Sequence, residues 1–335
     1  MPATILAIES SCDETSAAII SDGKILNNIV ATQSIHEKYG GVVPELASRA
    51  HQKNIVPVVE LTFQEAGITK NELDAVAFTQ GPGLLGALLV GNSFAKGMAL
   101  GLNIPLISVN HMQAHILAHF IEDPKPEFPF LCLTVSGGHT QIVLVEDHLK
   151  MKIIGETLDD AVGEAFDKIA KILGIPYPGG PLIDKYAKSG NSDRFSFSKS
   201  EMKDYDYSFS GIKTSVLYYL RKELKSDPDF IANNLHDLCA SVQKILVEML
   251  LLKLKKASKE LGINEVAIAG GVSANSHLRT EMKRLSSELN WDIYIPAFEY
   301  CTDNAAMIAM TAHYKFLNND FDSLASVPMP RLKFE

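Results

Sequence analysis

The sequence contains an internal duplication. TILAIESSCDETSAAIISDGKI (4–25) and FLCLTVSGGHTQIVLVEDHLK (130–150) share one order of strand, polar turn, strand and acidic turn. Later segments also correspond: AVAF with TQGPG matches VAIA with GGVSAN, and LISV with HMQAHILA matches IYI with PAFEYCTDNAAMIAM. Such self-similarity predicts two α/β domains of related fold that face each other across a central cleft, each contributing a polar hairpin to it.

The segment VNHMQAHILAHF (109–120) carries the clearest chemical signal. On a helix, His111 and His115 lie one turn apart on the same face, so both imidazoles can reach one metal ion. The duplication places Asp303 at the corresponding helix start of the second copy, which would bring it to the histidines where two helix ends meet at the cleft. Two histidines and a carboxylate leave open coordination positions that suit Fe(II) or Zn(II).

Simpler interpretations of these residues stay open at this point. Two histidines on an apolar helix are often only packed or solvated, and Asp303 follows Thr302 where a helix N-cap would lie. A metalloprotease of the HExxH type is disfavoured, because Met112 stands where the general base should be and a thioether cannot accept a proton from water.

Composition excludes several classes of protein. The formal net charge of −9 argues against binding of nucleic acid or anionic membranes by the whole surface, although local basic stretches remain. Four dispersed cysteines without CxxC pairing favour a reducing compartment. The N-terminus lacks the basic region of a signal peptide, and the apolar stretch 83–102, interrupted by polar residues, predicts a buried helix and no membrane span.

Other polar turns indicate a nucleotide or a cation. The first hairpin carries Asp13 and Glu14, whose carboxylates can hold a cation or orient water. In the second half, glycines let the backbone approach a flat ligand, and acidic or amide side chains can bind ribose hydroxyls or base edges. The second-half residues in question are Gly179, Gly180, Asp167, Asp184, Gly270, Gly271 and Asn275. Each alone could be only a turn or a helix cap.

Long motifs resemble one family. The chain is similar to the bacterial tRNA N6-adenosine threonylcarbamoyltransferases, within the actin/Hsp70/sugar-kinase superfamily, from about Ile5 to the C-terminal VPMPRLKF. The motifs are ESSCDET, GGVVPELASRAH, GPGLLGALLVG, NHMQAH, VSGGHTQ, DDAVGEAFDK, YPGGP, FSFSGIKT, AGGVSANSHLR and CTDNAAMIA. The resemblance implies two duplicated domains, which we place at 1–129 with about 296–335 and at 130–295, around a nucleotide and metal cleft.

The resemblance also implies an activity. Enzymes of this family move the threonylcarbamoyl group from L-threonylcarbamoyl-adenylate to N6 of the adenosine 3′ of the anticodon in tRNAs reading ANN codons, and AMP leaves. It implies a cytoplasmic enzyme whose partners are tRNA, a smaller paralogous subunit (TsaB), a P-loop ATPase (TsaE) and the upstream synthase that makes the adenylate. No membrane is involved.

Residue roles follow from the matched motifs. The resemblance implies that His111, His115 and Asp303 hold one divalent metal per subunit, with Fe(II) preferred over Zn(II). It implies an adenine nucleotide or adenylate as substrate ligand, bound by Thr134, Val135, Ser136, Gly137, Gly138, Asp167, Gly180, Asp184 and Asn275. Asp13 and Glu14 would face the reacting centre, and we expect Asp13 to be the carboxylate that assists the weakly nucleophilic amine.

Two other kinds of protein would share part of these features. A sugar or acetate kinase would share the fold and use ATP, but it does not need the His–His–Asp set. A non-catalytic nucleotide-dependent binding protein would not need a full set of metal ligands and motifs.

Overall fold

The computed structural model describes residues 3–199 and 202–333. The chain divides into two compact units. Unit 1 comprises Met1–Lys125, Glu146–Met151 and Pro296–Glu335, and unit 2 comprises Pro126–Val145 and Lys152–Ile295.

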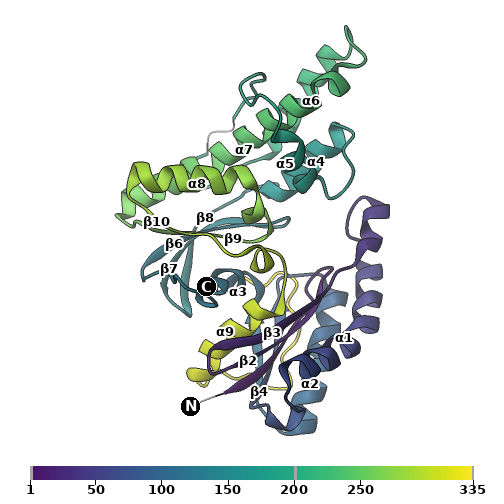
Figure 1. The fold of residues 1–335 in the computed structure, drawn as a ribbon, viewed down its shortest axis with the longest axis vertical. Coiled ribbons are helices and arrows are strands. Elements are labelled where there is room, and N and C mark those ends of the chain that lie inside the picture. The colour runs from purple at the N-terminus through teal and green to yellow at the C-terminus, as the bar shows by residue number, and fades with distance from the viewer. Residues whose placement is uncertain (1–2, 200–201, 334–335) are drawn as a thin grey trace. The chain divides into compact units, whose positions relative to one another are not determined.

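Unit 1 contains a mixed five-stranded sheet in the order β3-β2-β1-β4-β5 (Figure 1). Strand β1 runs antiparallel to β2 and parallel to β4, and β4 runs parallel to β5. The strands are β1 (Thr4–Glu9), β2 (Thr15–Ser21), β3 (Lys24–Ala31), β4 (Ala75–Gly81) and β5 (Leu106–Asn110).

The second sheet repeats this arrangement with five further strands, in the order β10-β9-β6-β7-β8. It belongs to unit 2 except for residues 146–151, at the end of β7 and the start of β8, which are grouped with unit 1. Strand β6 is antiparallel to β7 and parallel to β9, as β1 is to β2 and β4. The strands are β6 (Phe130–Val135), β7 (Thr140–Asp147), β8 (Lys150–Glu156), β9 (Glu265–Ala269) and β10 (Asp292–Tyr294). The predicted duplication is therefore confirmed, although the last strand begins and ends one residue earlier than the predicted Ile293–Ile295.

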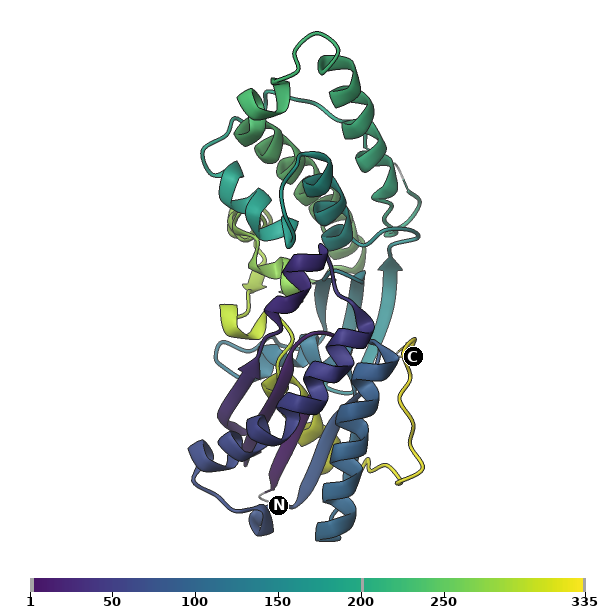
Figure 2. The ribbon, with the colours of Figure 1, turned by 90° about the vertical axis from the view of Figure 1, so that its right-hand side faces the viewer.

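Helices cover both faces of the first sheet. Helices α1 (Pro44–Ala66) and α2 (Leu85–Leu102) lie side by side and pack on β2 and β4 (Figure 2). Helix α9 (Ala305–Leu317) packs on β1, β2 and β3 from the opposite side in Figure 1. Helix α3 (His111–Leu117) packs on α9 and on β4 and β5. Because both faces are covered, β1 and β2 are buried almost throughout, which explains their continuous apolar runs.

Local signals in the sequence set the ends of these helices. Pro44 occupies the first turn of α1, where its missing amide hydrogen costs nothing. Gly67 ends the helix with φ of 66°, the left-handed conformation that glycine adopts freely. Both residue types mark a helix end in the sequence by their own backbone preferences.

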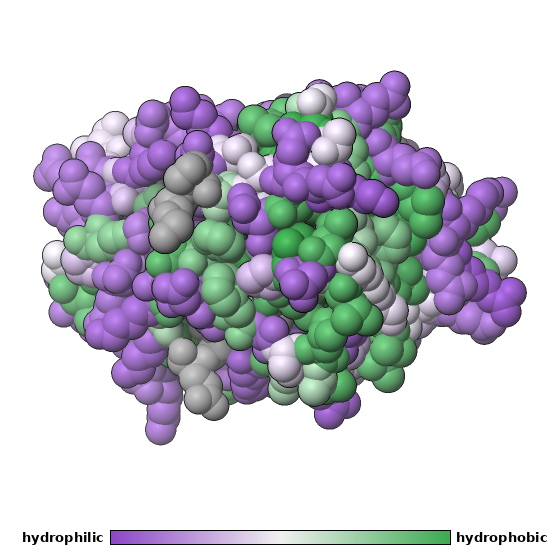
Figure 3. Space-filling model, turned by 90° about the horizontal axis from the view of Figure 1, so that it is seen from below, coloured by the Kyte–Doolittle hydropathy of each residue, from purple (hydrophilic) through white to green (hydrophobic). Residues whose placement is uncertain are grey.

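By length and composition, α2 is the one helix in the described part of the chain that could cross a membrane. It packs instead against β4 and α1 and buries Ala87, Leu88 and Asn92, as the core helix of a folded domain does. Part of its surface remains exposed, including Leu85 and Leu89. The face of the protein seen in Figure 3 likewise mixes hydrophobic areas with hydrophilic side chains.

Unit 2 has its own helices and core. The helices are α4 (Val162–Ile172), α5 (Gly179–Ala187), α6 (Ser210–Glu223), α7 (Phe230–Leu261) and α8 (Ser276–Leu289). Its apolar cluster joins β6 and β9 to the buried side of α4 and the long helix α7. Short 3₁₀ turns complete the chain at Ser34–Tyr39, Lys70–Glu72, Ala118–Phe120, Gly271–Ala274 and Phe298–Tyr300.

Candidate metal centre and neighbouring polar groups

The two histidines stand at the start of α3, directly after β5. The side-chain oxygen of Asn110 accepts hydrogen bonds from the amides of Met112 (2.9 Å) and Gln113 (3.2 Å). This cap satisfies amides that have no partner within the helix, so α3 begins at His111. One turn later His115 follows on the same face, and the two ring centroids are 4.7 Å apart.

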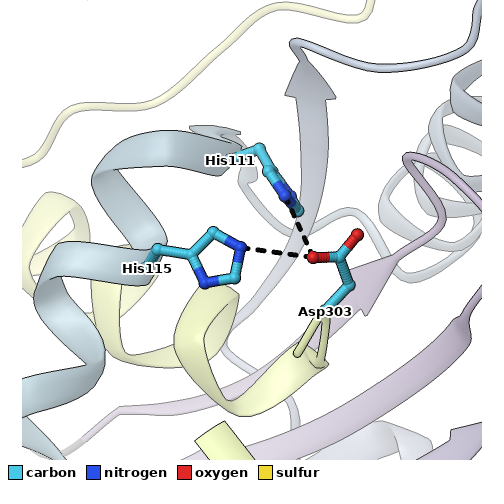
Figure 4. A group of neighbouring side chains, drawn as sticks. All are labelled: His111, His115 and Asp303. Atoms are coloured by element: carbon cyan, nitrogen blue, oxygen red, sulfur yellow. Dashed lines mark hydrogen bonds and ion pairs between the residues drawn. The ribbon is translucent and has the colours of Figure 1, made fainter. Parts of the chain in front are cut away.

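Asp303 completes a three-residue cluster. Its Oδ1 atom lies 3.3 Å from Nε2 of His111 and 3.2 Å from Nε2 of His115 (Figure 4). One ligand atom from each residue falls within 4.8 Å of the others. Both histidines are buried, whereas the Asp303 side chain is 23% exposed, so a ligand can reach the cluster from that side. These two nitrogens and one oxygen suit a divalent metal with open positions.

Asp303 stands directly before the N-cap of α9 and meets the histidines at the start of α3, so two helix starts come together as expected. The N-cap itself is Asn304, whose side chain accepts the amide hydrogen of Met307 at 3.1 Å. Helices α3 and α9 both belong to unit 1 and pack on each other, so the cluster lies within one unit.

Glu9 is the residue of this centre that the sequence analysis missed. It ends β1, is fully buried, and its Oε2 atom lies 3.0 Å from Nδ1 of His111 and accepts the Thr79 hydroxyl at 2.6 Å. Its Oε1 atom accepts the amide hydrogen of Ser11. The available signal is the acidic residue at the end of the apolar run LAIE, where the strand turns polar.

The charged groups of this centre strongly shift one another's pKa values. Burial opposes the charged form of His111, but the nearby carboxylates of Asp303 and Glu9 outweigh it and hold the His111 pKa well above its usual value. The pKa values of Glu9 and Asp303 are lowered, because attraction to His111 outweighs their burial. Burial and the neighbouring His111 lower the pKa of His115. Such a concentration of carboxylates binds cations well.

The loop between β1 and β2 adds two further acids. Burial, with the negative charges of Asp303 and Asp13, raises the pKa of Glu14 to about 9. Glu14 is therefore protonated at neutral pH, and it shares a hydrogen bond with Asp13. From α1, buried His51 contacts this loop on both sides: Nε2 lies 2.9 Å from the carbonyl oxygen of Cys12 and Nδ1 lies 2.8 Å from the Thr15 hydroxyl.

The predicted substrate residues all lie in unit 2, at a strand end with its following turn, at helix starts, and within helices α4 and α5. Asp167, on α4, accepts the amide hydrogens of Gly179 (2.8 Å) and Gly180 (3.1 Å) at the start of α5. From α5, Asp184 accepts the hydroxyl of Ser276 at 2.7 Å. Asn275 caps α8 through the amides of His277 and Leu278, and its amide group donates to Gln243 at 2.9 Å.

The glycine-rich turn predicted for the adenylate follows β6. Thr134 and Val135 end this strand, and Ser136, Gly137 and Gly138 form the turn to β7. The Ser136 amide donates to the His139 carbonyl at 2.8 Å, and its hydroxyl accepts the His139 amide at 3.0 Å. Because β6 and β9 are parallel neighbours, this turn and the turn that precedes Asn275 lie at the same edge of the sheet.

The structure thus brings the predicted residues together in two sets. The metal residues and the acids of the first hairpin belong to unit 1, and the predicted substrate residues belong to unit 2. Within unit 2, Asp184 connects helix α5 to the start of α8. Many of these polar atoms already have protein partners, so they shape the turns whether or not they also bind a ligand.

Comparisons with known proteins match one family along nearly the whole chain. The family model described as tRNA N6-adenosine threonylcarbamoyltransferase matches residues 24–310. A protein of that name from Cytophaga hutchinsonii is 63% identical over 333 residues, covering 99% of this chain and 97% of its own. Another from Riemerella anatipestifer is 62% identical, covering 98% and 97%, and one from Thermosipho africanus is 50% identical, covering 98% and 99%.

Solved structures of low identity share the fold. Full-length HypF in its phosphate- and nucleotide-bound form aligns with 94% of this chain and 46% of its own, at 13% identity and a TM-score of 0.60. Component A of the (R)-2-hydroxyglutaryl-CoA dehydratase of Acidaminococcus fermentans aligns with 93% and 98%, at 16% identity and a TM-score of 0.53. The predicted duplicated fold of the actin/Hsp70/sugar-kinase type is confirmed.

Proposed function

Because this chain belongs to the family of tRNA N6-adenosine threonylcarbamoyltransferases, we propose that it transfers the threonylcarbamoyl group of L-threonylcarbamoyl-adenylate to N6 of the adenosine 3′ of the anticodon, in tRNAs reading ANN codons. The resemblance drawn from the motifs is confirmed, and the chain is a transferase. The observation that carries the proposal is identity of 63% to a protein of this name over 99% of the chain.

The reaction needs help mainly with positioning and proton transfer. A bond forms between N6 and the carbamoyl carbon, the bond from that carbon to the phosphate oxygen breaks, and AMP leaves with the electron pair. The adenine amine is a weak nucleophile, so holding it close to the carbonyl and removing its proton both lower the barrier. We propose that Asp13 takes this proton. Glu14, whose pKa is raised to about 9, shares a hydrogen bond with Asp13 that holds the two side chains together.

Three residues would hold the metal. The His111, His115 and Asp303 ligand atoms converge within 4.8 Å, and their nitrogen and oxygen donors fit Fe(II), which we favour, or Zn(II). When bound, one such ion per subunit would supply Lewis-acid polarisation of a carbamoyl or phosphate oxygen.

The predicted residues of unit 2 would bind the adenylate. Glycine-rich turns are suited to phosphate oxygens, and the turn 136–138 after β6 is such a turn. Asp167, Asp184 and Asn275 are the side chains that we propose for the nucleoside. Their contacts with Gly179, Ser276 and Gln243 support this role by fixing where each side chain lies.

The partners follow from this substrate. We propose that the protein acts in the cytoplasm on tRNA, downstream of a synthase that makes the adenylate, with a smaller paralogous subunit (TsaB) and a P-loop ATPase (TsaE). We further propose that residues 1–129 with 296–335, and residues 130–295, form its two functional domains. The net charge of −9 indicates that tRNA contacts come from a local basic surface or from these partners.

Mass spectrometry of nucleosides from bulk tRNA tests the function. Cells depleted of this protein should lose N6-threonylcarbamoyladenosine, and wild type should restore it. The His111→Ala and Asp303→Ala variants should fail to restore it, whereas His236→Ala, which changes an exposed histidine of α7, should succeed. If depleted cells that hold no second copy of the enzyme keep their N6-threonylcarbamoyladenosine, the proposed transferase activity is refuted.

A further inference from the structure

Glu9 occupies an unusual position for a charged residue. It is 0% exposed at the end of a buried strand, where an unpaired carboxylate would be strongly unfavourable. Three groups surround it: the Ser11 amide and the Thr79 hydroxyl, which donate to it, and Nδ1 of His111, which lies 3.0 Å from Oε2. An ionised carboxylate can accept at both oxygens from all three, so the geometry fits ionised Glu9 beside a protonated Nδ1.

The contact with His111 determines which ring nitrogen keeps a proton. Neutral imidazole carries one proton, on Nδ1 or on Nε2, and only the bare nitrogen can bind a metal. Because Glu9 accepts from Nδ1 at 3.0 Å, it favours the tautomer with the proton on Nδ1. In that tautomer Nε2, which faces Asp303 at 3.3 Å, has the free lone pair.

The second histidine lacks such support. Nδ1 of His115 is buried and has no hydrogen-bond partner within the described part of the chain. The ring of His115 is therefore oriented by packing and by Asp303, whereas His111 is held at both nitrogens. The centre depends on Glu9 for one ligand only.

Thr79 and Ser11 hold Glu9 in turn. Thr79 lies on β4, the parallel neighbour of β1, and its hydroxyl donates to the same oxygen that faces His111. The Ser11 amide donates a hydrogen bond to the other carboxylate oxygen, Oε1. With both oxygens engaged, the carboxylate cannot rotate away from His111 without losing a hydrogen bond in a buried site.

We propose that Glu9 is a positioning residue that presents Nε2 of His111 to the metal, an inference that rests on the proposed metal centre. It acts through His111 and contacts neither metal nor substrate. Outer hydrogen bonds to metal-binding histidines typically change affinity 10- to 100-fold, so this is the size of effect expected here.

The Glu9→Gln variant tests the role with little change in shape. Its carboxamide has one oxygen and one NH₂ group, so it cannot accept at both ends. With NH₂ toward His111, the ring must move its proton to Nε2 and lose its metal-binding lone pair. With NH₂ toward Ser11, two donors face each other. Glu60→Gln, which changes an exposed glutamate on α1, is the matched control for charge.

Co(II) titration of the metal-free protein, followed by visible absorption, gives the affinity. We expect Glu9→Gln to bind Co(II) about 10- to 100-fold more weakly than wild type, while Glu60→Gln binds as wild type does. Thr79→Val, which removes only a donor to Glu9, should weaken binding in the same direction by a smaller factor. If circular dichroism shows that Glu9→Gln does not fold, the Co(II) affinity of Thr79→Val tests the positioning role of Glu9 instead.

Spectra of ¹⁵N-histidine protein loaded with Zn(II) report the tautomer directly. His111 of wild type should show a protonated Nδ1 and a metal-bound Nε2, and this pattern should be lost in Glu9→Gln. Equal Co(II) affinity and an unchanged His111 pattern in both variants would overturn the inference and leave the proposed function standing. Failure of wild type to bind Co(II) or Zn(II) would overturn the metal centre and this inference together.

Discussion

The hydroxyl of Thr15 lies 2.8 Å from Nδ1 of His51, and this contact ties helix α1 to the first hairpin. The other ring nitrogen lies 2.9 Å from the Cys12 carbonyl oxygen, so His51 spans the loop that carries Asp13 and Glu14. A carbonyl only accepts, so Nε2 donates to it, and Nδ1 accepts from the hydroxyl. These two contacts fit the neutral form of His51, in agreement with the lowering of its pKa by burial.

Replacing His51 should destabilise the protein and loosen this loop. In His51→Ala the Thr15 hydroxyl and the Cys12 carbonyl lose their partner in a buried setting, a change that costs about 1–3 kcal/mol for each unsatisfied group. Urea unfolding measures the loss. Thr15→Val should lose about 1 kcal/mol, while Thr214→Val, whose exposed hydroxyl bonds only to its own helix, should lose far less. Equal losses in both threonine variants would contradict the role of this contact.

Glu14 predicts a specific dependence of stability on pH in the metal-free protein. Its pKa is about 9 in the folded state and near 4.5 when unfolded, so folding favours its protonated form. The contribution of Glu14 to stability is fully present below pH 4.5 and is lost as the pH rises toward 9, because there only the unfolded state releases the proton readily.

The variant Glu14→Gln removes this titration. Its free energy of unfolding should fall less than that of wild type between pH 5 and pH 8.5, measured in urea after removal of metal. Glu60→Gln, exposed on α1, should follow the wild-type curve. If the curves of wild type and Glu14→Gln run parallel over this range, Glu14 has an ordinary pKa.

Metal binding should stabilise the folded protein through its three ligands. A ligand that binds only the folded state at 100 times its dissociation constant adds about 2.7 kcal/mol. Zn(II) should therefore raise the urea midpoint of wild type and leave that of His115→Ala nearly unchanged. The matched control His236→Ala, an exposed histidine, should respond as wild type does. A response of His115→Ala equal to wild type would show that Zn(II) acts elsewhere.

Much of this architecture could be predicted because the signals are local or repeated. Pro44 and Gly67 mark the ends of α1 by their own backbone preferences, and the duplication predicted the second sheet from the first. The pairing of His111 with His115 followed from helical periodicity alone. Each of these inferences needs only neighbouring residues or a comparison of one half with the other.

Glu9 and its partners could not be predicted in this way. Its contacts with Thr79 and His111 span 70 and 102 positions and depend on which strands are neighbours and in which register. Asp303 was found through the duplication, and its place beside the histidines depends on the return of α9 to unit 1 after the last strand of unit 2. The family resemblance implied this return, whereas no local sequence pattern predicts it.

The C-terminal segment gives a last prediction through Gly81. Its φ of 156° favours glycine, and a Cβ atom there would lie 1.9 Å from the carbonyl oxygen of Met329. Around this point Met329 donates to Gln80 at 2.7 Å and Gly83 donates to Pro330 at 3.2 Å. The substitution Gly81→Ala must therefore push residues 326–331 away from the end of β4. The atoms nearest to the new Cβ belong to the backbone of Met329, which cannot rotate aside as a flexible side chain could.

Limited trypsin digestion and hydrogen exchange measure this displacement. Cleavage after the exposed Arg331 should quicken, and the Met329 amide should exchange faster than in wild type. Gly97→Ala is the matched control, since nothing lies within 4 Å of a Cβ there. That change lies inside α2 and should stabilise the helix by up to about 1 kcal/mol. The added methyl group fits only if the C-terminal segment moves. Unchanged protection of the Met329 amide in Gly81→Ala would therefore contradict the close packing of this segment on Gly81.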